Sequence, residues 1–168
     1  MAVSSALPDF IGISEVDDGP FFAGELFQRK FGGAPPSDPH HLVCFYRSPA
    51  ATIHVLCYSH FSPFGDIILV GGVCTNGEAL RQLSVEQREA LSAVGSLYFQ
   101  VLKYGFARFA DRCEAFFGYC GDARAEQVNL QAGFSKTDHP HLLVNFHKPS
   151  HPVMQRALIA KAAAIGPF

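Results

Sequence analysis

The chain has 168 residues, of which 48% are hydrophobic and only 17% are charged, and its formal net charge is −2. A typical soluble domain has about 25% charged residues, so this composition excludes a disordered tail, a coiled coil and a polar linker, and it predicts a large buried core. Without a basic surplus, the sequence argues against a nucleic-acid partner and against adsorption to an anionic membrane. At roughly 150 residues per domain, we expect one domain over residues 1–168.

The first half of the chain predicts a helix followed by an antiparallel meander. Apolar side chains recur at helical spacing in residues 20–31, and Pro20 suits the first turn of that helix. β-branched and aromatic residues then dominate three segments, which are joined by connectors of hairpin length, SPAA and SPFG. The third segment is apolar almost throughout, so we expect it at the centre of the sheet with both faces covered. The strands predicted in this half are 8–13, 41–47, 52–61 and 66–75.

The second half predicts a long helix and then alternating strands and helices. Ser84 and Gln87 form a capping-box pattern before an amphipathic stretch. Gly133 stands where a helix would end, and Pro152 suits the first turn of the last helix. Residues 77–83 fit either a short helix or an extra strand. The other predicted elements are the helix 85–110, the strand 113–120, the helix 123–132, the strand 141–148 and the helix 150–165.

Signals for targeting, disulfides and metals are sparse. The longest apolar run, residues 67–74, falls well short of the roughly 18 residues that cross a bilayer, and no signal peptide is evident, so we expect a cytoplasmic protein. The five cysteines are odd in number and contain no C-x-x-C motif, which argues against a disulfide framework and a zinc knuckle. The eight histidines form pairs without a metal-binding signature, so we expect no metal site.

Residues 121–134, GDARAEQVNLQAGF, lie between two predicted strands and contain six residues at a characteristic spacing. The segment resembles the late conserved block of the GNAT superfamily of acyl-CoA N-acyltransferases, and the order of predicted elements agrees over about residues 41–148. The resemblance implies a single α/β domain with a mixed sheet, built from an antiparallel meander, a long helix and two parallel strands that splay apart. The positions that match the family block are Asp122, Ala125, Val128, Asn129, Gly133 and Phe134.

The resemblance also implies acetyl-CoA or another acyl-CoA as co-substrate. In this fold the pantetheine arm lies between the splayed strands, which would be 66–75 and 113–120, and its amides pair with strand-edge backbone. The pyrophosphate binds backbone N–H groups at the start of the long helix, and the nearest match to the family's phosphate loop is residues 88–96. The residues implied to bind CoA are Val73, Cys74, Arg88, Ala93, Gly95, Ser96, Asp122, Ala125 and Asn129.

Three positions depart from the family pattern. Arg88 stands two residues earlier than the loop's usual Arg or Gln. Ala93 replaces the first loop glycine, and its methyl group would hinder the close approach of a phosphate. Asn129 stands where many members carry a tyrosine that acts as general acid, and an amide has no proton to give at neutral pH. The catalytic residues therefore stay unassigned.

Three single motifs allow other interpretations. Residues 71–77 have the glycine spacing of a nucleotide-binding loop but lack its Lys and Ser/Thr, so we reject that function. Cys74 would be a nucleophile if His54 or His60 reached it from the neighbouring strand, and otherwise is a buried thiol. Asp122 is either an ordinary helix N-cap or a ligand contact.

We therefore expect transfer of an acyl group from acyl-CoA to a small-molecule or protein amine, with no convincing base in the sequence. Glu78 and Glu114 qualify only if their strand ends face the cleft. The alternative is a degenerate GNAT-like fold that binds a small apolar ligand without acyl transfer, which the departures from the pattern favour. A third class is a cysteine hydrolase built on Cys74. The apolar C-terminal helix either packs within the chain or makes a homodimer contact.

Overall fold

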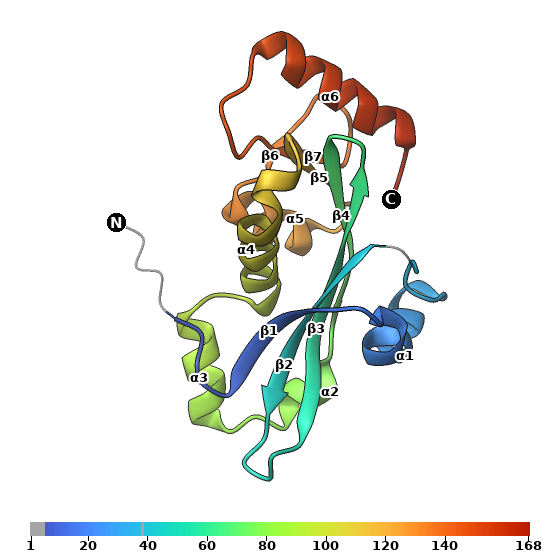
Figure 1. Cartoon of the computed structure of the whole chain (residues 1–168). Coiled ribbons are helices and arrows are strands. Elements are labelled where there is room, and N and C mark those ends of the chain that lie inside the picture. The colour runs from blue at the N-terminus through green and yellow to red at the C-terminus, as the bar shows by residue number, and fades with distance from the viewer. Residues whose placement is uncertain (1–5, 38) are drawn as a thin grey trace. The chain divides into compact units, whose positions relative to one another are not determined.

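The computed structural model describes residues 6–37 and 39–168 (Figure 1). In those residues, seven strands form one sheet in the order β1-β2-β3-β4-β5-β7-β6. The strands are β1 (Ile11–Val16), β2 (His40–Arg47), β3 (Ile53–Phe64), β4 (Ile67–Thr75), β5 (Ala115–Tyr119), β6 (Ser135–Lys136) and β7 (Leu142–Asn145). The helices are α1 (Gly19–Phe31), α2 (Gly77–Arg81), α3 (Val85–Ala93), α4 (Leu97–Phe109), α5 (Ala123–Ala132) and α6 (Pro152–Ile165), with a 3-10 turn η1 (Ala110–Arg112).

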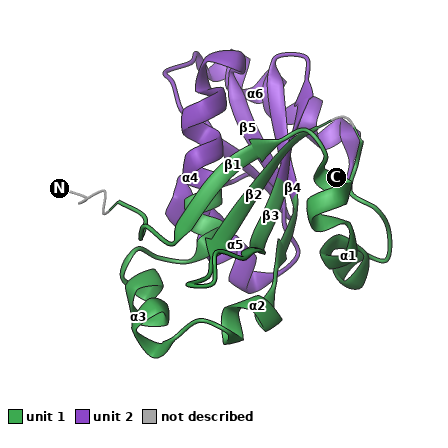
Figure 2. Ribbon diagram, turned by 60° about the horizontal axis from the view of Figure 1, so that its bottom comes forward, with its two compact units in different colours: residues 1–59, 72–101 green, residues 60–71, 102–168 purple. Residues whose placement is uncertain are grey.

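The chain divides into two compact units (Figure 2). Unit 1 comprises residues 1–59 and 72–101, and unit 2 comprises residues 60–71 and 102–168. Strands β3 and β4 and helix α4 each contribute residues to both units.

In unit 1, helix α1 packs on a strand surface through a narrow apolar stripe. Ala23 and Phe27 of α1 form a cluster with Val43, Tyr58 and Cys74. Strand β1 pairs antiparallel with β2 over its whole length. The helix starts as the sequence predicts, because the side chain of its N-cap residue accepts a hydrogen bond from a first-turn amide and a proline occupies the first turn.

In unit 2, the two faces of β5 are covered by different helices. Phe117 joins a cluster with Leu158 and Ala162 of α6. Its neighbour Phe116 points to the opposite face, where its ring lies 4.8 Å from that of Phe106 in α4. Strand β4 runs parallel to β5, and β5 runs antiparallel to β7. The predicted central strand is confirmed, since β4 is the fourth of seven and its residues 67–70 are all buried.

The predicted helix 85–110 is wrong, because the structure breaks it into α3 and α4. Gly95 adopts a left-handed backbone with φ of 93°, which ends the first helical path. The Oγ of Ser96 then accepts a hydrogen bond of 3.1 Å from the amide of Phe99 and caps the start of α4. The break creates a new helix N-terminus in the middle of the predicted helix.

Several boundaries also differ from the prediction. The SPFG connector is not a loop, because β3 continues to Phe64. Gly65, which has a φ of 62°, and Asp66 then turn the chain into β4. The first strand lies at β1 rather than at 8–13, and residues 77–83 contain the short helix α2. The last predicted strand shortens to β7, and the two-residue strand β6 carried no sequence signal. Helices 20–31, 123–132 and 150–165 are confirmed to within about two residues at each end.

Candidate functional site

In unit 2, the matched segment 121–134 folds around ordinary helix caps. The Asp122 carboxylate accepts a hydrogen bond of 2.7 Å from the amide of Ala125, which makes it the N-cap of α5. Gly133 ends the helix with φ of 118°. Asn129 is only 3% exposed, and its side chain hydrogen bonds to the thiol of Cys120, whose pKa is raised by burial. Asn129 therefore fills a structural position in the interior.

In unit 1, the predicted phosphate-loop residues fall on both sides of the helix break. Arg88 lies inside α3 and is exposed, and Ala93 is the last residue of that helix. Gly95 and Ser96 form the break itself, and both are exposed. The side-chain amide of Gln100 donates back to the carbonyl of Val94 and holds the turn closed. Of the predicted loop, only Gly95 and Ser96 therefore lie directly before the N-terminus of α4.

Val73 and Cys74 lie near the end of β4 and contact α1. Gly72 has a left-handed φ of 63°, which kinks the strand immediately before them. The ammonium of Lys30 donates a hydrogen bond of 2.6 Å to the carbonyl of Val73. The thiol of Cys74 donates to the carbonyl of Gly72 at 3.4 Å. Both predicted residues are therefore held by backbone contacts at one kinked strand end.

The Cys74 thiol is not poised as a nucleophile. It packs in the apolar cluster beneath α1, and burial raises its pKa to about 11, which the nearby charge of Lys30 only partly offsets. A thiol with this pKa stays protonated at neutral pH, and the thiolate is the nucleophilic form. His54, one of the suggested partners, stacks on the ring of Tyr46 at 5.8 Å. The geometry supports the buried-thiol interpretation of Cys74.

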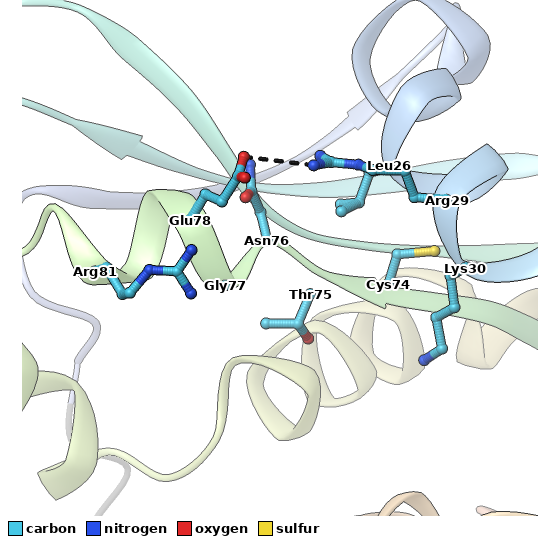
Figure 3. A pocket seen from close by; sticks show the side chains of 9 residues that line it. All are labelled: Leu26, Arg29, Lys30, Cys74, Thr75, Asn76, Gly77, Glu78 and Arg81. Carbon is cyan, nitrogen blue, oxygen red and sulfur yellow. Dashed lines mark hydrogen bonds and ion pairs between the residues drawn. The ribbon is translucent and has the colours of Figure 1, made fainter.

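A pocket of about 360 Å³ opens beside this strand end (Figure 3). Helix α1, the end of β4 and helix α2 line it. Asn76 fixes the corner, since its side chain accepts from the amide of Ala79 at 3.2 Å and donates to the carbonyl of Val55 at 3.0 Å. The lining residues are Leu26, Arg29, Lys30, Cys74, Thr75, Asn76, Gly77, Glu78 and Arg81.

The pocket carries more positive than negative charge. Arg29, Lys30 and Arg81 line it together with a single carboxylate, Glu78. Arg29 and Glu78 form an ion pair of 3.4 Å between side chains that are both more than half exposed. Such an exposed pair contributes little to stability, so both groups remain available to a ligand.

Sequence analysis identified part of this pocket. Cys74 and Glu78, which it singled out separately, both line it, whereas in unit 2 Glu114 forms an ion pair of 3.0 Å with Lys148. The basic residues Arg29, Lys30 and Arg81 were missed, because they belong to no motif. Their only signal was the basic last turn of α1, which is also an ordinary feature of helix ends.

Two further observations concern metals and membranes. Over residues 6–37 and 39–168, no group of three or more His, Cys, Asp or Glu is arranged to hold a metal ion. No helix in the described part of the chain is long and apolar enough to span a bilayer.

Comparison with known proteins decides the fold. No family model and no curated protein sequence matches the chain, but solved structures do. A Brucella melitensis GNAT family acetyltransferase, solved in complex with acetyl-CoA, superposes with a TM-score of 0.53 at 12% identity, covering 84% of this chain and 91% of its own. The chain has the GNAT fold. The predicted mixed sheet, with an antiparallel meander and one parallel strand pair, is thereby confirmed.

Two other acetyltransferase structures share this GNAT fold. A Pyrococcus horikoshii protein assigned as an acetyltransferase has a TM-score of 0.54 at 8% identity over 82% of this chain, which spans only 47% of the Pyrococcus chain. A chimeric spermidine N-acetyltransferase from Vibrio cholerae has a TM-score of 0.50 at 8% identity, covering 82% of this chain and 96% of its own. At these identities the comparison establishes the fold alone.

Proposed function

We propose that the chain is an acyl-CoA-dependent N-acyltransferase. The observation that carries the proposal is the GNAT sheet, in which the parallel pairing of β4 with β5 runs from Ile67↔Ala115 to Val70↔Gly118 while β4 continues to Thr75. The proposal is supported by the relatives, since the Brucella structure holds acetyl-CoA and the Vibrio chimera is named for N-acetylation of spermidine.

The acyl-pantetheine arm is proposed to lie along Val73 and Cys74. Val73 and Cys74 lie beyond the pairing of β4 with β5, which ends at Val70, and backbone groups that β5 does not pair need other partners, which the amides of pantetheine supply. The kink at Gly72 changes the direction of the chain just before these residues. A backbone N–H near Val73 would stabilise the oxyanion that forms when the thioester carbonyl is attacked.

The CoA pyrophosphate is proposed to bind at the N-terminus of α4. This helix is 13 residues long, so its dipole favours an anion at its start, and Gly95 leaves the backbone bare there. Arg88 and Ala93 belong to α3, and we assign them a place near the phosphate only through the family pattern. Asp122 is explained by its cap and Asn129 by its burial, so neither is assigned to the chemistry.

The proposed reaction is direct transfer. The neutral amine attacks the thioester carbonyl, a C–N bond forms, the C–S bond breaks, and CoA leaves as the thiolate and then takes a proton. The proton released by the amine passes to water or to Glu78, the carboxylate that lines the pocket beside Cys74. The alternative ligand, a small apolar molecule, suits this site poorly because four of the nine lining residues are charged.

An assay of CoA release tests the proposal. Acetyl-CoA is incubated with a panel of amines, free thiol is followed over time, and the N-acetylated product is identified by mass. In Ser96→Asp, the new side chain still caps α4 but places a carboxylate at the proposed pyrophosphate site, and the KM for acetyl-CoA should rise about tenfold or more. Ser96→Asn is the matched control, because it caps equally well without a charge. A KM for acetyl-CoA that Ser96→Asp leaves unchanged would refute the proposed phosphate site.

A further inference from the structure

The charge of the pocket beside β4 limits what can occupy it. Glu78 compensates Arg29 through their ion pair, while Lys30 donates to the uncharged carbonyl of Val73 and stands 5.4 Å from the centre of the Phe31 ring. Among the described residues, Arg81 forms no ion pair, and its guanidinium lies over Gly77, where an added Cβ would stand 3.7 Å from Nη1 (Figure 3). Two positive charges therefore face the pocket without a carboxylate to balance them.

We propose that this pocket binds a small amine that also carries an anionic group, either a carboxylate or a phosphate. The inference deepens the proposed function and rests on it for one step, because it identifies this amine as the acyl acceptor. The anionic group binds to Arg81, and the ammonium group lies on the side of Glu78, while Lys30 adds positive charge at the other end of the pocket (Figure 3). A guanidinium recognises both anions with paired hydrogen bonds, which explains why carboxylate and phosphate are treated as one class.

The arrangement of charge selects against other amines. A polyamine would bring two or more positive charges to a lining that already has an excess of two. A simple alkylamine would satisfy Glu78 but leave Arg81 without a counterion. The volume of about 360 Å³ is at the small end for ligand pockets and fits an amino-acid-sized molecule.

The position of the pocket connects it to the transfer step. Cys74 lines the pocket and is also one of the two residues proposed to contact the thioester. Lys30 lines it as well and is bonded to the carbonyl of Val73, the other such residue. An amine held in the pocket therefore lies next to the strand end where the acyl group is proposed to be.

A binding experiment without CoA tests the pocket independently of catalysis. The probes are β-alanine and O-phosphoethanolamine, compared with propylamine and spermidine, and each is titrated by calorimetry. We expect the two anionic amines to bind, and the stronger of the two identifies the anion. Arg81→Gln should weaken their binding about tenfold or more, which corresponds to about 1.4 kcal/mol. Arg124→Gln, at an exposed arginine of α5, is the control and should leave binding unchanged.

Acyl transfer is then measured with the same four amines and acetyl-CoA. We expect kcat/KM to be highest for an anionic amine and to fall about tenfold in Arg81→Gln for that amine, with little change for propylamine. Equal binding of propylamine, spermidine and the anionic amines would overturn the inference. So would an Arg81→Gln variant that weakens acetyl-CoA binding and leaves amine binding intact, since the pocket would then hold part of CoA.

Failure of the proposed function has a different signature. If acetyl-CoA neither binds nor reacts while β-alanine or O-phosphoethanolamine still binds in an Arg81-dependent manner, the anion site is supported and its role as an acceptor site is refuted. The two proposals can therefore fail separately.

Discussion

The ammonium of Lys30 donates a hydrogen bond of 2.6 Å to the carbonyl of Val73, and this bond ties the last turn of α1 to the end of β4. The contact joins two segments that are 43 positions apart in the chain. It fixes the orientation of the Val73 peptide, along which the acyl-pantetheine arm is proposed to lie.

Replacing Lys30 with methionine tests the importance of this bond. Lys30→Met keeps the aliphatic stem but leaves the Val73 carbonyl without its donor, so we expect a loss of about 1 kcal/mol of stability and a Tm lower by about 2–4 °C. Lys103→Met, at an exposed position of α4, is the control and should change the Tm by less than about 1 °C. Equal effects of the two variants would contradict a structural role of the bond.

Buried thiols should weaken the protein at alkaline pH. Burial raises the pKa of Cys44 and of Cys57 from the ordinary value of 9.0 to about 12. Above pH 9 the unfolded chain releases these protons while the native state retains them, so stability is present below pH 9 and is lost as the pH rises toward 12. Each thiol contributes a loss of up to about 1.4 kcal/mol per pH unit in that range.

Cys57→Ala isolates this effect. The variant should be less stable than the parent at pH 8, because a buried side chain has been truncated. Between pH 9 and 10.5 it should lose less stability than the parent, since one titrating thiol is gone. Urea unfolding at pH 8, 9.5 and 10.5 measures both, and parallel losses in the two proteins would contradict the assignment.

The contact between Gly105 and Phe61 predicts a strict size limit in unit 2. A Cβ on Gly105 would overlap the Phe61 ring, which is fully buried. Gly105→Ala should therefore cost about 2–3 kcal/mol, although alanine is the better helix former. Gly24→Ala in α1, where a Cβ meets nothing within 4 Å, should instead stabilise the protein by about 0.5–1 kcal/mol. Chemical denaturation of both variants would test this opposition of sign.

The cap of α5 distinguishes the two interpretations of Asp122. Asp122→Ala removes the acceptor for the Ala125 amide and should cost about 1 kcal/mol, whereas Asp122→Asn retains a capping oxygen and should cost much less. Neither change should alter the Kd for acetyl-CoA by more than about twofold, because the side chain is occupied by the cap. A large loss of affinity in Asp122→Asn would restore the ligand-contact interpretation.

Local signals in the sequence predicted most of the fold, and the exceptions have physical causes. Ser84 and Gln87 form the expected capping box, because a cap depends only on residues three positions apart. The break at Gly95 was missed since the apolar stripe continues through α3 and α4, and an isolated glycine is tolerated in many helices. The end of β3 was misplaced because Pro63 usually marks a turn, yet here it lies inside the strand.

The candidate site was less predictable than the fold. Arg29 and Glu78 are 49 positions apart, and their pairing depends on how α1 packs near the end of β4. No local pattern reports such a pairing, so the basic character of the pocket could not be inferred. The expectations of a homodimer, of a cytoplasmic location and of a single domain stay predictions.

Thermal unfolding with and without acetyl-CoA tests whether this fold binds acyl-CoA. A ligand that binds only the native state and is present at about 100 times its Kd adds roughly 2.7 kcal/mol of stability. For a chain of this length we expect a Tm increase of about 5–10 °C. This increase should be lost in Ser96→Asp and retained in Ser96→Asn. No increase at millimolar acetyl-CoA would contradict the proposal that this fold binds acyl-CoA.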